Sequence, residues 1–410
     1  MTSLILCTPK VLLQNTPEEW LEATGGDAVL FTGLADAETS KAVEELATRA
    51  FRQSEFFHNY EHSELIEQSA IDLHLRTRFS RVLAFSEADV LRAARIRNKL
   101  ALQGQMPEAA QFFRDKILMK RRAWERGVDV PRFAEITSAT DLTEFISAHG
   151  LPVVVKPFDG RGSSGVAVLS TEQDVVSFLE SGASSTLRYT VEQFVQGEMF
   201  RVDGLYVDGS PVVIHAARYL KDCLAFIRGE TIGTHSLDAG NPLVGRIEEF
   251  TRYLLEKALP FPATSIFHLQ IFHTPDDRLV LCEVASRLGG GVINEEVLIA
   301  TGINMKMGYV KASIGGGDTL ERRAAADFRP TARIIIPPKH GVLESLPLAA
   351  EHDWIDIYKP YGVVGRRYGG ASMTNAEVAS FVFGGENEEE LRSRALDLDS
   401  WFNSKTMWAL

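Results

Sequence analysis

The sequence predicts an α/β protein that combines a parallel sheet with antiparallel hairpins. In the first hundred residues, short apolar runs alternate with helical patterns, which is typical of a parallel sheet covered by helices. At residues 153–169, by contrast, two apolar runs rich in valine flank a glycine-rich turn and predict a hairpin. A second hairpin is predicted at residues 265–284, where the turn Thr274-Pro-Asp-Asp277 joins two apolar runs.

Composition is typical of a globular protein. The residues are 45% hydrophobic and 24% charged, which are ordinary values for a globular protein. The length of 410 residues is enough for several subdomains and a large buried core. The formal net charge is −12 and no long basic run occurs, so we expect neither nucleic acid nor an anionic membrane as a partner. No apolar run approaches the roughly 18 residues of a membrane-spanning helix.

The cysteines and the first residues predict a cellular compartment. Cys7, Cys223 and Cys282 are widely scattered and form no CxxC motif, which favours a reducing environment. The first eight residues lack the charged region of a secretory signal and are interpreted as a strand. We therefore expect a cytoplasmic protein, and a homodimer is compatible with the sequence.

The amino-terminal elements follow from the apolar pattern. Strands are expected at 3–7, 28–31 and 81–85, and helices at 39–51 and 87–97. The first strand leads to no glycine fingerprint, so no nucleotide site is indicated there. Pro107 begins and Gly127 ends one further predicted helix, which carries Lys116 and Lys120 on one face.

The remaining elements are expected in the following order. A helix begins near residue 171, and strands follow at 189–194, 200–207 and 211–217. Residues 221–245 have no clear period and predict a functional lid or a disordered segment. After a helix near 247–258 and the second hairpin, the tail predicts strands at 332–336, near Gly362 and near Ala379, and a helix at 388–402.

The turn of the first hairpin carries the strongest functional signal. Lys156 ends the first strand, and the small residues of the turn are Gly160, Gly162, Ser163, Ser164 and Gly165. Glycine allows backbone N–H groups to approach phosphate oxygens closely, while the lysine supplies a positive charge. A dinucleotide fingerprint is excluded because a strand follows the turn, and a P-loop because Val166 follows Gly165. An ordinary surface hairpin is the alternative.

Carboxylates near two other strands suit nucleotide and metal binding. Glu192 and Glu198 lie on and just beyond the strand at 189–194, where a ribose and an adenine edge could be bound, although surface glutamates are the simpler interpretation. Gln270 and Glu283 pair across the second hairpin, and Arg287 lies four residues further on. Oxygen ligands on adjacent strands suit Mg²⁺, and an arginine beside them can stabilise a transferring phosphoryl group. An ion pair between Glu283 and Arg287 is the alternative.

Taken in order, these motifs resemble the ATP-grasp superfamily over residues 81–310. The segment that begins Phe85-Ser-Glu is similar to the part that leads into the grasp domain of carboxylate-amine ligases, notably the dipeptide-forming amino acid ligases. The tail is similar to the C-terminal portion of biotin-carboxylase-like members. The resemblance implies a Rossmann-like parallel-sheet domain at 1–108, two grasp subdomains at 109–188 and 189–328, and a C-terminal α+β extension at 329–410.

The resemblance also implies ATP and Mg²⁺ as cofactors and a role for each motif. Lys116 and Lys156 would contact phosphates, and the glycine hairpin would close over the γ-phosphate. The remaining implied contacts are adenine with Glu192, Phe194 and Val195, ribose with Glu198, the metal with Glu283 and Gln270, and the acylphosphate with Arg287.

The implied reaction joins a small-molecule carboxylate to an amine through an acylphosphate. We expect an amino acid or acylated amino acid to be joined to a second amino acid, in small-peptide, natural-product or antibiotic biosynthesis. An arginine can clamp its carboxylate, and a loop-rich region should border the cleft. The candidate substrate residues are Arg201, Arg218, Lys221, His235, Gly289 and Gly290.

Two departures from the family pattern leave alternatives open. Gln270 stands where an acidic residue is usual, and Ala285 stands where an asparagine is usual. Both changes weaken the expected metal site and leave an impaired nucleotide-binding regulator as one alternative. A carboxylase, or a ligase with an acceptor other than an amino acid, is another. A protein kinase is excluded because its lysine should follow the glycine hairpin.

Overall fold

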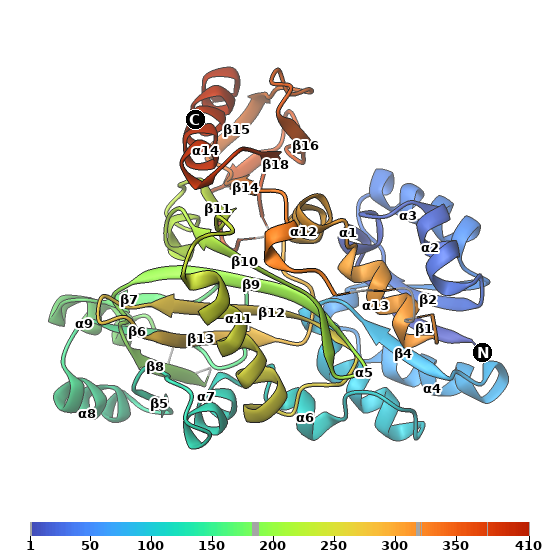
Figure 1. The fold of residues 1–410 in the computed structure, drawn as a ribbon, viewed down its shortest axis with the longest axis horizontal. Coiled ribbons are helices and arrows are strands. Elements are labelled where there is room, and N and C mark those ends of the chain that lie inside the picture. Colours follow the sequence, from blue (N-terminus) through green and yellow to red (C-terminus); the bar gives the residue numbers. More distant parts are fainter. Residues whose placement is uncertain (1, 183–187, 317–319, 321, 375, 410) are drawn as a thin grey trace.

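The computed structural model describes residues 2–182, 188–316, 320, 322–374 and 376–409. Figure 1 shows a long central sheet with the amino-terminal region at one end, a small sheet region at the other, and the carboxyl-terminal region above it. No helix among the described residues is long and apolar enough to cross a membrane.

The amino-terminal region is the predicted parallel sheet. Its four strands lie in the order β3-β2-β1-β4, and all three pairings are parallel. The sequence did not predict β3, because Gln-Ser-Glu-Phe-Phe begins with three polar residues and has no apolar run. The elements are β1 (Ser3–Leu6), α1 (Pro9–Leu12), α2 (Pro17–Thr24), β2 (Ala28–Gly33), α3 (Ala37–Ala50), β3 (Gln53–Phe57), η1 (Tyr60–His62), α4 (Leu65–Thr77), β4 (Arg81–Ala84) and α5 (Glu87–Lys99).

The predicted helix at 107–127 is two helices, so that prediction is wrong in its extent. The chain forms α6 (Pro107–Gln111) and then α7 (Lys116–Glu125). The side chain of Asp115 accepts hydrogen bonds from the backbone N–H groups of Ile117 and Leu118, which begins the second helix. The new start places Lys116 at the first turn, close to the glycine hairpin.

The glycine hairpin belongs to a small antiparallel sheet of order β5-β8-β6-β7. The predicted hairpin is confirmed, because β6 pairs with β7 in the register that joins Val153 to Leu169. Two helices pack on this sheet around a small apolar core. The elements are β5 (Phe133–Ile136), α8 (Ala139–His149), β6 (Val153–Pro157), β7 (Ala167–Leu169), α9 (Glu172–Glu180) and β8 (Tyr189–Gln193).

The central sheet has eight antiparallel strands in the order β13-β12-β9-β10-β11-β14-β18-β16. The second predicted hairpin is confirmed as β12 and β13. The strands are β9 (Glu198–Val207), β10 (Ser210–Tyr219), β11 (Ile232–Ser236), β12 (Ser265–His273), β13 (Leu279–Ala285), β14 (Thr331–Ile336), β16 (Ile355–Pro360) and β18 (Ala379–Gly384).

The expectation of a lid or disordered segment at 221–245 is wrong. This stretch contains the short helix η2 (Cys223–Ala225) and then β11, which lies inside the central sheet. All five residues of β11 are buried, and their sequence is Ile-Gly-Thr-His-Ser. A strand buried on both faces shows no alternation, and these small and polar residues also lack an apolar run.

One apolar core joins the amino-terminal region to the central sheet. Helices α12 (Ile293–Thr301) and α13 (Met305–Ser313) pack between them, so that Leu30, Phe85, Leu205 and Val297 belong to a single buried cluster. On the sheet's β9–β12 side, α11 (Leu243–Tyr253) continues as a π-helical turn, η3 (Leu254–Ala258). The site therefore rests on rigidly packed elements.

The carboxyl-terminal residues extend the central sheet and add a second small sheet. The second small sheet consists of β15 (His340–Ser345), β17 (Arg367–Gly369) and β19 (Met407–Ala409). Two helices belong to the same region: η5 (Ala325–Asp327) precedes β14, and α14 (Glu388–Lys405) follows β18. The strand predicted near Gly362 corresponds to β16, which ends at Pro360, and Gly362 itself lies in the connection between β16 and β17. The division of the chain at residues 108, 188 and 328 stays a prediction.

Candidate functional site

Two adjoining chambers open between the glycine hairpin and the central sheet. The first has a volume of about 750 Å³ and lies between the hairpin, the β8–β9 connection and the sheet. The second, of about 920 Å³, lies between the hairpin, the amino-terminal region and the sheet. The two chambers share Arg161, Gly162, Ser163, Tyr219, Cys223, Gln270 and Glu283 in their linings. They therefore form one continuous cleft, and Gln270 and Glu283 lie at the junction of its two chambers.

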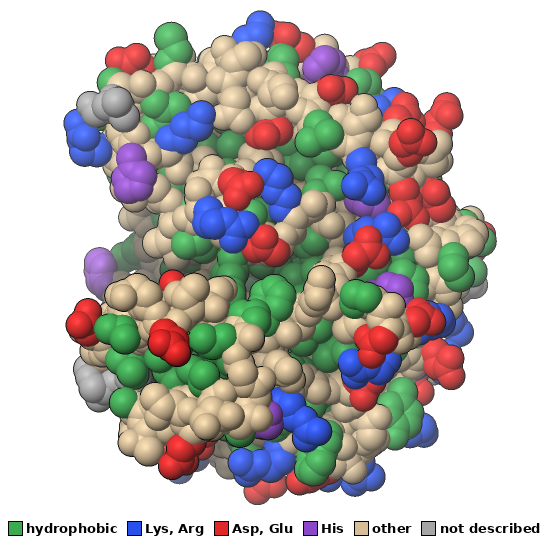
Figure 2. Space-filling view, turned by 90° about the vertical axis from the view of Figure 1, so that its left-hand side faces the viewer, with side chains coloured by type: hydrophobic (Ala, Val, Ile, Leu, Met, Phe, Trp, Pro, Cys, Tyr) green, Lys and Arg blue, Asp and Glu red, His purple; other side chains and the backbone are tan. Residues whose placement is uncertain are grey.

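The surface around the cleft carries mixed charges. On the face drawn in Figure 2, acidic and basic side chains alternate, and the surface is indented at mid-height between an upper and a lower part. No extended area of a single charge is seen on this face.

A buried carboxylate holds two lysines at the wall of the first chamber. The carboxylate of Glu192 lies 2.9 Å from Nζ of Lys156 and 3.0 Å from Nζ of Lys120. Burial alone would lower the pKa of Lys156, but Glu192 raises that pKa above its ordinary value. Burial likewise opposes ionisation of Glu192, and the two lysines nevertheless lower its pKa. Lys156 and Glu192 are therefore held in their charged forms, whereas burial lowers the pKa of Lys120 from its ordinary value although Glu192 opposes the shift.

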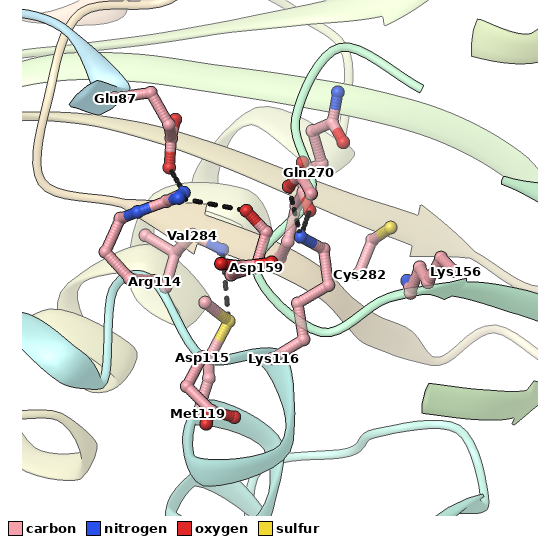
Figure 3. Close-up of polar contacts among 12 residues, drawn as sticks. Glu87, Arg114, Asp115, Lys116, Met119, Lys156, Asp159, Gln270, Cys282 and Val284 are labelled. Atoms are coloured by element: carbon pink, nitrogen blue, oxygen red, sulfur yellow. Dashed lines mark hydrogen bonds and ion pairs between the residues drawn. The ribbon is translucent and has the colours of Figure 1, made fainter. Parts of the chain in front are cut away.

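Lys116 connects the glycine hairpin with strand β13. Its Nζ donates a hydrogen bond to the carbonyl oxygen of Gly160 at 2.6 Å and lies 3.4 Å from the carboxylate of Glu283. Figure 3 shows Lys116 projecting from α7 towards this strand, with Lys156 on the far side of Cys282. Burial would raise the pKa of Glu283, but Lys116 and Lys156 lower it to about 2. Glu283 is thus an anion between cations.

Gln270 and Glu283 lie opposite each other, as predicted. They are register partners on β12 and β13, and the pairing shifts by a bulge directly after Gln270. The amide nitrogen of Gln270 donates to the hydroxyl of Tyr219 at 2.9 Å, which leaves the amide oxygen as its free acceptor. Ala285 is buried and has no ligating atom.

These oxygens suit a cation that binds mainly through another molecule. Within the described part of the chain, no group of three or more His, Cys, Asp and Glu side chains could hold a metal ion. One carboxylate and one amide oxygen can nevertheless complete the shell of a Mg²⁺ that also takes phosphate oxygens and water. The donor set therefore fits Mg²⁺ together with a nucleotide and does not fit Mg²⁺ alone.

Glu87 fixes Arg287 at the entrance to the second chamber. Nε of Arg287 donates to the carboxylate of Glu87, and Nη1 donates to the carbonyl oxygen of Leu288. Arg114 also donates to Glu87, and to the backbone oxygen of Asp159 at 2.9 Å, as Figure 3 shows. Burial would raise the pKa of Glu87, but Arg287 and Arg114 lower it to about 2.

Glu87 was not identified from the sequence. The available signal was an acidic residue in the first turn of a predicted helix, directly after the strand at 81–85. That pattern is common at helix starts, where it needs no further role.

The hairpin tip contacts both the amino-terminal and the carboxyl-terminal regions. Arg161 forms an ion pair with Glu61 of η1. The carbonyl oxygen of Gly162 accepts a hydrogen bond from the backbone N–H of Thr374 at 3.0 Å. Gly162 has a φ of +57°, a conformation that favours glycine. The hairpin therefore covers the junction of the two chambers in a closed arrangement.

The other predicted nucleotide contacts line the first chamber. Phe194, Val195 and Glu198 all border it, and Phe194 is 44% exposed. Arg218 lies 3.5 Å from Glu198 and 3.8 Å from Glu388, which starts α14. This places the carboxyl-terminal helix at the outer rim of the first chamber.

The structure separates the predicted substrate residues into different places. Arg218, Lys221 and His235 line the first chamber, whereas Gly289 and Gly290 line the second. A methyl group built on Gly289 would lie 2.7 Å from Oδ1 of Asp203, so this turn passes too close to the sheet for a larger residue.

Arg201 requires a correction. It is fully buried and lines neither chamber, so a substrate cannot contact it. Its guanidinium is held by Thr234, Asp203 and Glu296. Arg201 is the register partner of Gln270 and so lies on the same face of the sheet, but the side chains of Thr234, Asp203 and Glu296 enclose its guanidinium.

Comparison with known proteins agrees with this geometry. No protein-family model matches the chain. The chain is 25% identical over 229 residues to the L-arginine-specific L-amino acid ligase of Bacillus subtilis, a match that covers 53% of this chain and 54% of that protein. It thus spans about half the length of this curated relative.

Solved structures match along nearly the whole chain. The L-amino acid ligase from Bacillus licheniformis aligns with a TM-score of 0.76 and 18% identity, covering 100% of this chain and 99% of that one. The biotin carboxylase domain of 2-oxoglutarate carboxylase from Hydrogenobacter thermophilus, solved with MgADP, ADP and bicarbonate, aligns with a TM-score of 0.69 and 11% identity, covering 99% and 90%. The chain therefore has the ATP-grasp fold, which confirms the resemblance indicated by the sequence.

Proposed function

We propose that this chain is an ATP- and Mg²⁺-dependent ligase that joins a carboxylate to an amine and releases ADP and phosphate. The observation that carries the proposal is the meeting of two chambers at Gln270 and Glu283, with Lys116 and Lys156 on one side and Arg287 on the other. Such an arrangement allows a nucleotide and a second substrate to approach each other end to end.

The first chamber suits ATP. Lys116 now lies beside Glu283, and Lys156 beside Glu192. Phosphate oxygens can replace part of these contacts, because an anionic phosphate stabilises the charged form of a lysine just as a carboxylate does. Backbone N–H groups of the glycine hairpin can bind the terminal phosphate. Phe194 and Val195 supply apolar contact for adenine, and Glu198 can accept from ribose hydroxyls.

Phosphoryl transfer would take place at the junction of the two chambers. Mg²⁺, held by Glu283, Gln270 and the phosphates, would neutralise charge on the γ-phosphate. A carboxylate oxygen attacks the γ-phosphorus, ADP leaves, and an acylphosphate forms. Arg287 would bind the new phosphate, and catalysis would rest on positioning and charge neutralisation rather than on a protein nucleophile.

Amide formation would follow in the second chamber. The neutral amine attacks the acyl carbon, and Arg287 would stabilise the negative charge on the tetrahedral intermediate. Phosphate then leaves with the bridging oxygen that came from the carboxylate, and the amine nitrogen loses a proton. An amino acid or acylated amino acid as one substrate is supported by the similarity to L-amino acid ligases.

A second candidate function is supported by the metal site. With Gln270 and Ala285 in place of stronger ligands, the chain could bind ATP without turning it over and act as a regulator. A carboxylase, or a ligase for an acceptor other than an amino acid, is a third candidate. A cytoplasmic location, a homodimer and a role in small-peptide or antibiotic biosynthesis stay predictions.

Phosphate release distinguishes these functions. The purified chain is incubated with ATP and MgCl₂ and a matrix of amino acids, acylated amino acids and amines, each alone and in pairs. Release that needs both a carboxylate and an amine supports the ligase. ATP binding without release for any pair favours the regulator, and release that needs bicarbonate favours a carboxylase.

A further inference from the structure

A paired aspartate and histidine lie at the wall of the second chamber. Nδ1 of His268 on β12 lies 2.8 Å from Oδ1 of Asp203 on β9, and the two residues are register partners. Asp203 is fully buried, whereas His268 lines the second chamber. The pair therefore connects the interior of the protein with the cavity.

Asp203 determines which nitrogen of the imidazole carries the proton. Its second oxygen, Oδ2, accepts a hydrogen bond from Nη1 of Arg201 at 2.6 Å. Burial would raise the pKa of Asp203, but His268 and Arg201 lower it. Asp203 is thus an anion that can only accept, so Nδ1 of His268 donates to it. In the neutral ring, Nε2 then carries the free lone pair.

The Nε2 atom of His268 is open to a ligand. It has no hydrogen-bond partner among the described residues, and it is not one of their buried polar atoms that lack a partner. It is therefore accessible from the chamber that the ring lines. At the other nitrogen, a methyl group built on Gly289 would lie 2.7 Å from Oδ1 of Asp203 and 3.0 Å from Nδ1 of His268. The loop at Gly289 thus covers the bond between the two side chains and leaves Nε2 free.

The acidic side chains of the second chamber already have partners. Those in the described part of the chain are Asp36 with Thr39, Glu61 with Arg161, Glu87 with Arg287 and Arg114, and Glu283 with Lys116. Each would have to give up its partner before it could take a proton from a substrate. His62, the other histidine of this chamber, is exposed and has no carboxylate partner within the described ranges. His268 is therefore the base that is both oriented and free.

The pair also lies within electrostatic reach of Arg287. Burial would lower the pKa of Arg287, but Glu87 raises it, and Glu283 and Asp203 add to this effect. His268 and Arg287 line the same chamber, and Gln270 lies two residues beyond His268 on the same face of β12. A base at His268 would thus lie beside the junction at which the acylphosphate forms.

We propose that His268 is the general base of amide formation and that Asp203 is its positioning residue. The inference rests on the proposed ligase function and adds a catalytic residue to it. As the amine nitrogen bonds to the acyl carbon, one proton of that nitrogen moves to Nε2 of His268. The bond between the acyl carbon and the phosphate oxygen then breaks. The imidazolium, which the Asp203 anion stabilises, gives its proton to the departing phosphate, which leaves as HPO₄²⁻.

Hydroxylamine separates the two halves of the reaction. It is uncharged at neutral pH and traps an acylphosphate as a hydroxamate without the help of a base. Rates of hydroxamate formation, and of amide formation with the most active amine of the matrix above, are compared for the wild type and His268→Asn. Asparagine can still donate to Asp203 from a nitrogen placed like Nδ1, but it lacks Nε2.

The expected result is a loss confined to amide formation. We expect His268→Asn to lose about 100-fold in amide formation, and less than roughly threefold in hydroxamate formation, because a general base typically contributes 10²–10⁴ in rate. Equal losses in both products would show that the ring only supports the site, and would overturn the assignment. An unchanged rate of amide formation would overturn it as well.

Free imidazole tests the base itself. In His268→Ala, imidazole added to the solution can occupy the space of the missing ring and accept the proton. We expect it to raise the rate of amide formation with increasing concentration and to leave hydroxamate formation unchanged. Rescue of both products to the same extent, or of neither, would contradict the assignment.

His273→Asn is the matched control. His273 lies on the same strand, pairs with Asp277 at 2.7 Å and lines neither chamber. The same substitution there should leave the ratio of the two rates at the wild-type value. Thermal unfolding and ADP binding report on the folding of every variant, and His268→Gln gives the same comparison if His268→Asn does not fold. Failure of the wild type to form either product with any carboxylate would instead count against the proposed function.

Discussion

The Nε atom of Arg287 donates a hydrogen bond to the carboxylate of Glu87, a residue 200 positions earlier in the chain. Glu87 starts α5 in the amino-terminal region, and Arg287 follows β13 of the central sheet. The same carboxylate accepts from Arg114, which also holds the backbone of the glycine hairpin. One buried anion therefore aligns three separate parts of the site.

Glu87→Gln should lower kcat more than it changes the KM for ATP. The amide keeps the shape of the side chain but removes the charge that holds both arginines, so the Arg287 guanidinium loses its fixed orientation. Breaking a buried charge pair costs roughly 3–5 kcal/mol, so the melting temperature should fall as well. Glu67→Gln, which removes a more exposed partner of Arg95, is the control. An unchanged kcat would show that Glu87 does not position Arg287.

Arg287→Ala should abolish product formation while the protein stays folded. The guanidinium is the cation assigned to the acylphosphate, and removal of such a group typically costs on the order of 10²–10³ in rate. Product is measured by mass spectrometry alongside ADP affinity. An active Arg287→Ala enzyme would contradict the assigned role.

Lys156→Ala should abolish product and also destabilise the fold. Among the described residues, Glu192 would keep Lys120 as its only lysine partner. The negative charge of the buried carboxylate would then be only partly balanced, which lowers the free energy of unfolding. Lys156→Arg keeps the charge and should recover stability more fully than activity. Chemical unfolding measures the first quantity and phosphate release the second, and an unchanged unfolding midpoint in Lys156→Ala would contradict the buried pair.

Glu283→Gln should raise the magnesium concentration needed for half-maximal activity. The exchange removes the carboxylate ligand of the proposed site, whereas Gln270→Glu adds a second one and should lower the requirement. Initial rates are measured over a series of MgCl₂ concentrations at fixed ATP. If neither variant shifts the curve, another carboxylate holds the metal.

Lys306 should make stability depend on pH in the alkaline range. Burial lowers its pKa from 10.5 to about 8, although Cys7 and Glu295 oppose the shift. Between these values the unfolded chain binds a proton that the folded chain does not, so stability from this group rises with pH, by up to about 1.4 kcal/mol per unit. Below pH 8 both states are protonated and the slope vanishes. Urea unfolding of the wild type and Lys306→Met at pH 7.5 and 9.5 gives the difference, and equal slopes would contradict it.

Much of the fold followed from local sequence signals. The parallel sheet, both hairpins and the pairing of Gln270 with Glu283 were predicted, because apolar runs and turn residues mark strands and their register. The break between α6 and α7 was missed because Phe112–Asp115 continues the helical pattern, and only the capping contact of Asp115 shows the new start.

Parts of the site could not be predicted, for physical reasons that differ between residues. Arg333, which lines the second chamber, stands in the apolar run Thr-Ala-Arg-Ile-Ile-Ile, and a single arginine in such a run was an available but unused signal. Arg201 was misplaced because the sequence does not show that Thr234 of β11 and Glu296 of α12 enclose its side chain. Glu87, Arg114 and Arg287 meet only through the packing of the amino-terminal region on the central sheet.

The most direct test of the central claim follows an oxygen atom. The carboxylate substrate is labelled with ¹⁸O, the ligation is run with ATP and MgCl₂, and the phosphate product is analysed by mass spectrometry. If an acylphosphate forms and an amine displaces the phosphate, each phosphate released carries one ¹⁸O from the carboxylate. Phosphate without label, or release of AMP and pyrophosphate in place of ADP, would contradict the account.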